Sequence, residues 1–335
     1  MSILALLLLA ALPPQDDSTE KTFGDWAVAC DNSGRCEAVA LVPESRLDDA
    51  PFDFKIARDA GPDGGVTLGG DAFAQGPVDL VVNGKVVARA LAGSREIGLA
   101  GPAAERVANA MATGRGDLVL RSPTGTLIAR ISLTGVSATL RYIDARQGRA
   151  GGVTALVAKG GKPKASVPAA RDLPRIAARR PTRGAMQPLA PAQEAGMRAR
   201  GECDLSPDEM NEIKSERHRL DAGTTLVLLP CALGAYNLSS AVFVLTPRGI
   251  SPAQFDSGVD GESEAGVPLI INTNWDEETG VLSSFTKGRG LGDCGSVRDW
   301  VWDGERFRMI RSEALDVCRG STAWPVVFRA EPVWR

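Results

Sequence analysis

Histidine is nearly absent from this chain of 335 residues, which contains a single one, His218. Histidine-based catalytic triads and multi-histidine metal sites need several imidazoles that converge on one site, so this scarcity excludes most of them. His218 lies in the charged run 216–219, which is typical of a solvated helix face. We therefore predict no metal site, no cofactor and no histidine-dependent active site.

Excess charge of one sign and long hydrophobic runs are also lacking. The 38 Lys and Arg residues nearly balance the 41 Asp and Glu residues, and the net charge of −3 indicates no nucleic acid partner. The apolar run from Ile3 to Leu12 is too short for a bilayer span, which takes about 20 residues, but it matches the core of a secretory signal. No Lys or Arg precedes it, so a buried N-terminal strand or helix is the alternative. We expect a signal-like segment at 1–14 and no membrane span after its removal.

The six cysteines form no C-x-x-C motif of the zinc or redox kind. Their even number favours disulfides, which persist only in an oxidising compartment, over buried free thiols. Sequence alone does not choose the connectivity, and the simplest one pairs neighbours: Cys30 with Cys36, Cys203 with Cys231, and Cys294 with Cys318. The protein is accordingly expected to be periplasmic or secreted.

Length and residue pattern predict two β-rich domains, because a chain of this length is longer than those that usually fold around one hydrophobic core. In the first domain, placed at 20–158, Asn83-Gly84 separates two alternating runs and predicts a hairpin. Helices are expected after Pro102 and within 135–147, and a further strand at 153–157. We expect this domain to be sandwich-like.

Residues 159–200 are expected to form a flexible basic linker. From 149 to 200 the chain holds eleven Lys or Arg residues against two acidic ones, with many Ala, Gly and Pro. Such a composition buries too little apolar surface to offset the entropy lost on ordering. The positive charge also suits contact with anionic envelope polymers, but a solvated spacer is the simpler interpretation.

The second domain, placed at 201–335, is expected to be an antiparallel β-meander with a leading helix. Ser206-Pro207-Asp208-Glu209 has the pattern of a capping box with a first-turn proline, and predicts a helix to about Leu220. Turns near Thr279-Gly280 and at Asp303-Gly304 predict two hairpins. The fold class is thus mainly β with a few short helices (α+β). Core packing or an aromatic recognition surface would account for four tryptophans: Trp275, Trp300, Trp302 and Trp324.

Several short motifs, each different from the others, are distributed over both halves of the chain. They are Phe23-Gly24-Asp25-Trp26, Cys30-Asp31-Asn32 with Cys36, Arg141-Tyr142-Ile143-Asp144, Arg146-Gln147-Gly148-Arg149, Leu229-Pro230-Cys231, Gly234-Ala235-Tyr236-Asn237, Thr279-Gly280-Val281-Leu282, the loop 287–295, Trp302-Asp303-Gly304 and Cys318-Arg319-Gly320. Through them the chain resembles the proteobacterial family catalogued as domain of unknown function 1176. That resemblance implies no catalytic residues.

The first half also resembles, more weakly, the invasion-associated locus B proteins. The likeness rests on a Trp-x-x-x-Cys opening and on Ser132-Leu133-Thr134-Gly135 after a small helix. It implies an exported, sandwich-like domain at the bacterial envelope, again without catalytic residues.

The glycine-rich loop 287–295 is the main candidate for a binding site. Its four glycines allow the backbone to approach a ligand closely, while Lys287, Arg289 and Asp293 supply charge. A small anionic ligand fits this composition. No phosphate-binding glycine motif matches, and Cys294 anchors the loop, so a structural bend is the alternative.

Two further patterns suggest chemistry, and each has a simpler explanation. Ser284-Phe285-Thr286-Lys287 matches the S-x-x-K pattern of acyl transfer, but it falls in an expected strand, where positions i and i+3 point to opposite faces. An acidic loop offers oxygen ligands for calcium without the spacing of an EF-hand, and a hydrated loop is simpler. Its residues are Asp256, Asp260, Glu262 and Glu264.

These observations favour an exported, non-enzymatic protein that binds an envelope polymer or another protein through loops at one end of the second domain. One alternative is a hydrolase or transferase acting on cell-wall or peptide substrates, whose catalytic groups would have to meet in one cleft. Its candidates are Asp293, Asp299, Asp303 and Ser284. Another alternative is a small inhibitor whose 287–293 loop plugs the active site of a hydrolase.

Overall fold

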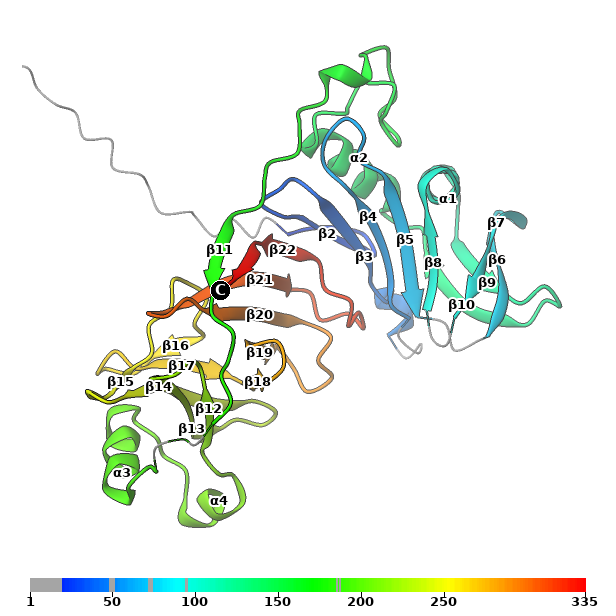
Figure 1. Ribbon diagram of the computed structural model, residues 1–335. Coiled ribbons are helices and arrows are strands. Elements are labelled where there is room, and N and C mark those ends of the chain that lie inside the picture. The colour runs from blue at the N-terminus through cyan, green and yellow to red at the C-terminus, as the bar shows by residue number, and fades with distance from the viewer. Residues whose placement is uncertain (1–19, 48–51, 72–74, 94–95, 185, 187) are drawn as a thin grey trace, which may run out of the picture.

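The structure is a computed structural model that describes residues 20–47, 52–71, 75–93, 96–184, 186 and 188–335 (Figure 1). The signal-like segment expected at 1–14 lies outside these residues. Antiparallel strands dominate the described chain, and four α-helices and two short 3-10 helices lie between them. The expected class, mainly β with a few helices, is confirmed.

The first unit is built on one ten-stranded sheet in the order β1-β2-β3-β4-β5-β8-β7-β6-β9-β10. Its strands are β1 (Lys21–Phe23), β2 (Trp26–Cys30), β3 (Cys36–Ala40), β4 (Phe54–Arg58), β5 (Val66–Asp71), β6 (Gly76–Val82), β7 (Lys85–Ala92), β8 (Glu96–Ala100), β9 (Asp117–Arg121) and β10 (Leu127–Ser132). β7 and β8 are joined by a single residue pair, Ala92 with Ile97. The expected sandwich-like arrangement is thus one continuous sheet whose two halves meet at this pair.

Two helices pack on one face of this sheet and complete its core. In α1 (Gly101–Thr113) the buried residues Ala104, Val107, Ala108 and Met111 recur at helical spacing. The second helix is α2 (Val136–Arg146), and the short 3-10 helix η1 (Glu44–Arg46) precedes β4. The predicted hairpin is also present, since Val82 pairs with Lys85 across the turn.

The segment 159–200 contains η2 (Lys164–Ser166), β11 (Arg175–Ala178) and α3 (Pro191–Arg200). β11 pairs in parallel with β23 (Glu331–Trp334), and Ile176, Ala178 and Met197 are buried. The expectation that this segment buries little apolar surface is wrong at these positions, because its few apolar side chains pack on strands that are distant in the sequence. The domain boundaries stay a prediction.

The second unit contains two antiparallel sheets after a short helix, α4 (Pro207–Glu212). One sheet has the order β12 (Glu216–Arg219), β13 (Thr225–Leu233), β14 (Leu238–Thr246), β17 (Pro268–Ile271) and β16 (Gly261–Glu262), with β15 (Gly249–Pro252) paired to β14. The other is a meander of β18 (Asn274–Asp276), β19 (Val281–Lys287), β20 (Gly295–Trp302), β21 (Phe307–Leu315) and β22 (Val326–Arg329). Both predicted hairpins occur in this meander.

The four tryptophans considered for core packing or recognition are buried. Trp275, Trp300 and Trp302 pack with Leu226 and Val242 in the core between the two sheets of the second unit. Trp324 belongs to a different cluster, at the contact with the first unit. Of the two interpretations of these residues, core packing is therefore confirmed.

Two predicted elements are wrong. The helix expected to reach Leu220 ends at Glu212, and 216–219 pair with β13 as a strand instead, so tertiary pairing overrides the helical pattern of charges. No strand forms at 153–157, because the backbone N–H groups of Leu156 and Val157 bind the carboxylate of Asp144.

Three disulfides join cysteines that are neighbours in the sequence, and none of the six cysteines is free. Cys30 and Cys36 are directly opposite one another in the β2–β3 hairpin. Cys203 is linked to Cys231 in β13, and Cys294 to Cys318. Each disulfide closes a loop within one unit, so the contact between the units is entirely non-covalent apart from the chain itself.

Candidate functional site

The glycine-rich loop 287–295 uses two of its charges internally. Arg289 donates to both carboxylate oxygens of Asp293, with 2.7 Å between Nε and Oδ1. Asp293 is 2% exposed and also accepts from the backbone N–H of Gly320 at 2.6 Å. The hydrogen bonds from Arg289 are the main cause that lowers the pKa of Asp293 below its ordinary value of 3.8. Lys287 lies over the ring of Phe285. Anion binding by this loop stays a prediction.

The same loop is held from outside and carries an exposed tip. The hydroxyl of Tyr236 donates to the carbonyl of Gly288, and Nδ2 of Asn237 donates to the carbonyl of Lys287, each at 2.9 Å. The side chain of Leu291, in contrast, is 74% exposed. The backbone of the loop is therefore held in place by two hydrogen bonds, and its tip is apolar and exposed.

The residues considered for hydrolase or transferase chemistry do not meet in one cleft. Ser284 is buried in β19, three residues before Lys287. Asp293 precedes β20 and Asp303 follows it, so this strand of eight residues, roughly 25 Å long, separates the two carboxylates. Asp299 accepts a hydrogen bond from Ser283 on the neighbouring strand.

Two of the four acidic residues considered for calcium, Asp256 and Asp260, are bound to protein groups. Asp256 accepts from Arg308 and from the backbone N–H of Met309, and Asp260 accepts from Arg298. Over the described residues, no three His, Cys, Asp or Glu side chains converge in a way that suits a metal ion. These two carboxylates thus fix strands of the second unit, whereas Glu262 and Glu264 are exposed.

His218 lies in β12, not on a helix. Its Nδ1 is 2.6 Å from Glu277 and its Nε2 is 3.1 Å from Glu216, and its ring packs near Trp275. The imidazole therefore links β12 to the β18–β19 turn by contacts with two carboxylates.

The two β units pack against each other through an apolar cluster, with Arg319 at its edge. Ala27, Val39 and Leu41 of the first unit share a cluster with Leu315 and Trp324 of the second. At the edge of this cluster Arg319 donates to the carbonyls of Val42 and Gly24, at 2.9 and 3.0 Å, and pairs with Asp25. Two of the short motifs, around residues 25 and 319, therefore meet across the interface.

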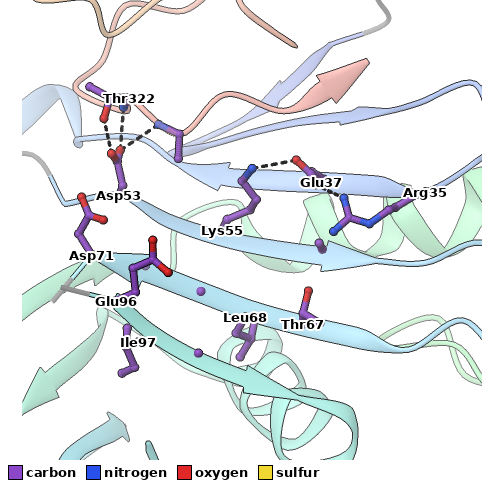
Figure 2. Close-up of a pocket in the computed structure, with 15 residues that line it drawn as sticks. Arg35, Glu37, Asp53, Lys55, Thr67, Leu68, Asp71, Glu96, Ile97 and Thr322 are labelled. Atoms are coloured by element: carbon purple, nitrogen blue, oxygen red, sulfur yellow. Dashed lines mark hydrogen bonds and ion pairs between the residues drawn. The ribbon is translucent and has the colours of Figure 1, made fainter. Parts of the chain in front are cut away.

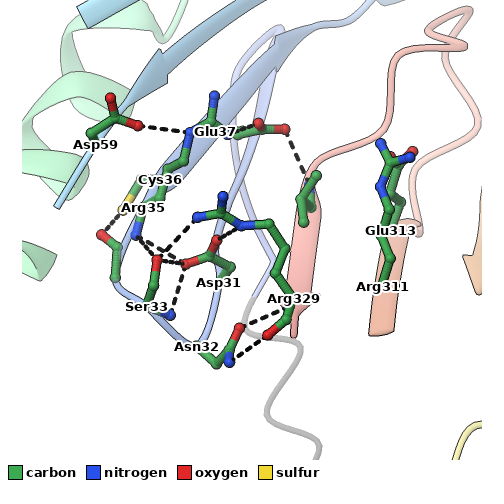
Figure 3. Close-up of polar contacts among 12 residues, drawn as sticks. Asp31, Asn32, Ser33, Arg35, Cys36, Glu37, Asp59, Arg311, Glu313 and Arg329 are labelled. Atoms are coloured by element: carbon green, nitrogen blue, oxygen red, sulfur yellow. Dashed lines mark hydrogen bonds and ion pairs between the residues drawn. The ribbon is translucent and has the colours of Figure 1, made fainter. Parts of the chain in front are cut away.

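A second polar network joins the units at the Cys30–Cys36 turn (Figure 3). Asn32 exchanges two hydrogen bonds of 2.9 Å with the backbone of Arg329, while the guanidinium of Arg329 pairs with Asp31. Asp31 also accepts from the backbone N–H groups of Ser33 and Arg35, which keeps the turn closed. The motif Cys30-Asp31-Asn32 is thus a docking element for β22.

A groove of about 550 Å³ lies beside this interface, on the face of the first sheet that the helices leave uncovered (Figure 2). Gly69 and Gly98 are paired on β5 and β8 and contribute no side chain to it. Thr322 and Ala323 of the second unit line it too. Both units therefore frame the groove, and the glycine pair deepens its floor.

The charges of the groove are unevenly distributed. Asp71 and Glu96 lie opposite one another on β5 and β8 at one end, and Arg35 and Glu37 lie toward the other (Figure 2). Four carboxylates and two cations line the groove, which gives it a formal charge of −2 from Glu37, Asp53, Asp71, Glu96, Arg35 and Lys55. The lining as a whole is therefore net negative, which favours a cationic ligand.

Lys55 and Asp53 connect the groove to the interface. Nζ of Lys55 is 2.9 Å from Glu37, and burial lowers the pKa of this lysine below its ordinary value of 10.5. Asp53 accepts from the backbone N–H groups of Thr322 and Ala323, at 2.7 and 3.2 Å. The wall that the second unit contributes is therefore hydrogen-bonded to Asp53, the residue directly before β4.

The groove is not predicted by the pattern of residues along the chain. The only local signals are Gly69-Gly70 and Gly98, in strands that otherwise alternate, because glycine within a strand often marks the close approach of a ligand or another backbone. The pairing of Gly69 with Gly98 depends on strand order, which the pattern along the chain does not specify.

Comparison with known proteins identifies the family. No solved structure matches the chain. A curated relative, the uncharacterized protein YpfG of Escherichia coli (strain K12), is 32% identical over 213 residues, and the match covers 59% of this chain and 59% of that protein. The weaker resemblance to the invasion-associated locus B proteins stays a prediction. The model of the protein family of unknown function DUF1176 matches residues 20–331, so the chain belongs to the DUF1176 family.

Proposed function

We propose that this protein is an exported, non-enzymatic binding protein, periplasmic or secreted, that holds an amine-bearing polar ligand of the cell envelope in the groove between its two units. Export is supported by the three disulfides, which persist only under oxidising conditions. No helix of the described residues is long and apolar enough to cross a membrane.

The observation that carries the proposal is the anionic groove of about 550 Å³. Ligand sites occur preferentially where two units meet, and this volume suits a short polymer segment. The glycine pair allows the ligand to approach the strand backbone, while the net negative charge of the lining attracts its amino groups. Amino groups occur both in amino sugars and in lysine-containing peptides, and these are the two sources to be distinguished.

Isothermal titration calorimetry of the full chain with a glucosamine tetramer and with tetralysine tests this proposal. Each ligand is matched with its N-acetylated form, which keeps the shape and removes the positive charge. We expect one amine-bearing ligand to bind and its acetylated form to bind at least about tenfold more weakly. The ligand that binds identifies the source.

Gly98→Val places a side chain in the groove at a position where a Cβ meets nothing within 4 Å, so the fold is retained. Gly261→Val, in the edge strand β16, is the matched control, because a Cβ there also meets nothing. The first variant is expected to lose binding and the second to keep it. Equal binding by the two variants, or no binding of either amine-bearing ligand to the unmodified protein, contradicts the proposal.

A second candidate function, inhibition of a hydrolase, is favoured by the exposed tip of the 287–293 loop. Protein inhibitors of hydrolases present pre-organised loops, and here Leu291 projects from a loop supported by Tyr236 and by the Cys294–Cys318 disulfide. Lysozyme and trypsin, assayed with a molar excess of the full chain, test this function. Inhibition that is lost in Leu291→Gly supports it, and full activity of both enzymes in the presence of the unmodified protein counts against it.

A further inference from the structure

A smaller pocket of about 270 Å³ lies on the first unit and shares no lining residue with the groove. It is bounded by the end of β4, by residues 62–65, by α1 and by the stretch 153–164. Because its lining belongs to the first unit and the segment that follows it, ligand binding here does not depend on the contact between the units.

Arg58 provides unsatisfied hydrogen-bond donors at this pocket. The side chain is only 3% exposed, and one of its terminal nitrogens donates to the carbonyl of Thr154 at 2.9 Å. Its Nε and Nη1 are buried without a partner, as is the hydroxyl of Thr154. A buried, charged donor without an acceptor is costly, so these groups are suited to a ligand that supplies acceptor oxygens.

The walls of the pocket are fixed before any ligand arrives. Asp144, fully buried, accepts from the backbone N–H groups of Leu156, Val157 and Ala158 at 2.8 to 3.0 Å. Arg149 donates to the carbonyl of Gly61 on the opposite side. These contacts hold both flanking loops in place, which reduces the entropy that binding would otherwise cost.

The charge of the lining limits the ligand. Three cations, Arg58, Lys159 and Lys164, face two carboxylates, Asp63 and Glu105, so the lining has a formal charge of +1. Burial is the main cause that lowers the pKa of Arg58 to about 10, so its guanidinium stays charged at neutral pH. This balance matches a single negative charge, whereas the two carboxylates disfavour a phosphate dianion.

We propose that this pocket binds a small monocarboxylate that also carries a hydroxyl or ammonium group. The carboxylate of the ligand accepts hydrogen bonds from Arg58 and Thr154, and the hydroxyl or ammonium group donates to Glu105 or Asn109, which line the same pocket. L-lactate and L-alanine are the simplest compounds of this class.

The thermal unfolding midpoint of the full chain tests the inference, with L-lactate, L-alanine, inorganic phosphate and the neutral analogue lactamide added separately at millimolar concentration. We expect lactate or alanine to raise the midpoint by about 2 °C or more, since a ligand that binds only the folded state stabilises it. Lactamide and phosphate are expected to give smaller shifts.

Arg58→Met removes the guanidinium and is expected to abolish the shift, while Arg130→Met, at an exposed position of β10, keeps it. If Arg58→Met does not fold, Thr154→Val replaces it, because it removes a hydroxyl that has no partner, and it is expected to weaken binding about fivefold in calorimetry. The inference is overturned if neither carboxylate shifts the midpoint, if phosphate gives the largest shift, or if binding is unchanged in the variant of Arg58 or Thr154 that folds.

Discussion

At the scale of single residues, buried aspartates organise this protein. Asp31, Asp144 and Asp293 are each less than 5% exposed, and each binds donors from another segment of the chain. The donors are the guanidinium of Arg329 for the first, backbone N–H groups of a loop for the second, and Arg289 with Gly320 for the third. A buried carboxylate is tolerated only when such donors surround it, so each of these side chains fixes the position of the segment that supplies them.

Asp293→Asn is expected to lower the free energy of unfolding by about 2 kcal/mol at pH 7. The hydrogen bonds from Arg289 lower the folded-state pKa of Asp293, so the stability that its ionised form contributes is fully present above the unfolded value, near 3.8. It is lost as pH falls through the lower, folded pKa. Urea unfolding at several pH values should therefore show the largest difference between the two proteins above pH 5 and a smaller one toward pH 3.

Glu262→Gln is the control for this prediction, because Glu262 is an exposed carboxylate in β16. It is expected to change the unfolding free energy little at any of these pH values. A difference between Asp293→Asn and the unmodified protein that grows as the pH is lowered would contradict the assignment.

At the scale of elements, the parallel pair of β11 and β23 ties the segment after the first unit to the C-terminus. Ile176 and Ala178 of β11 form a buried cluster with Val301, and Trp334 of β23 packs against it. Removal of residues 331–335 is expected to expose β11, so that trypsin cleaves at Arg175 or Arg179 at least about tenfold faster than in the full chain. Limited digestion followed by mass spectrometry measures this rate, and equal rates would show that the pairing does not protect the segment.

Elements with a strong local pattern were predicted from sequence, and elements that depend on distant partners were not. The hairpin at Asn83-Gly84 and the helix α2 follow from turn chemistry and apolar spacing, which act over a few residues. β11 and β12 exist because β23 and β13 pair with them. The groove and the Arg58 pocket escaped prediction for the same reason, since each is assembled from segments that are separated along the chain.

At the scale of the whole molecule, the interface makes the two units one body. Phe285 stacks on Trp324 at 5.2 Å between ring centroids, within the cluster that Ala27 and Val39 complete from the first unit. An apolar contact of this kind couples the unfolding of the units that share it. Arg319 and Arg329 of the second unit also form ion pairs with the first unit, and these pairs fix the orientation of one unit on the other.

Arg319→Ala is expected to destabilise this body by about 2 kcal/mol, because it removes the donor to the carbonyls of Val42 and Gly24 and the ion pair of Asp25, which keeps a hydrogen bond from Ser132. Differential scanning calorimetry should show one transition in the unmodified protein and either a lower midpoint or two transitions in the variant. Arg248→Ala, at an exposed turn, is the control and should leave the trace unchanged. Two separate transitions in the unmodified protein would contradict the description of one body.

The proposed function depends on where the ligand binds, and hydrogen exchange measured by mass spectrometry locates that site most directly. With saturating glucosamine tetramer or tetralysine, whichever binds, we predict slower exchange in β5, in β8 and in the wall around Thr322, with no change in the loop 287–295. Slower exchange confined to that loop, or to neither region, would contradict a ligand site in the groove between the two units.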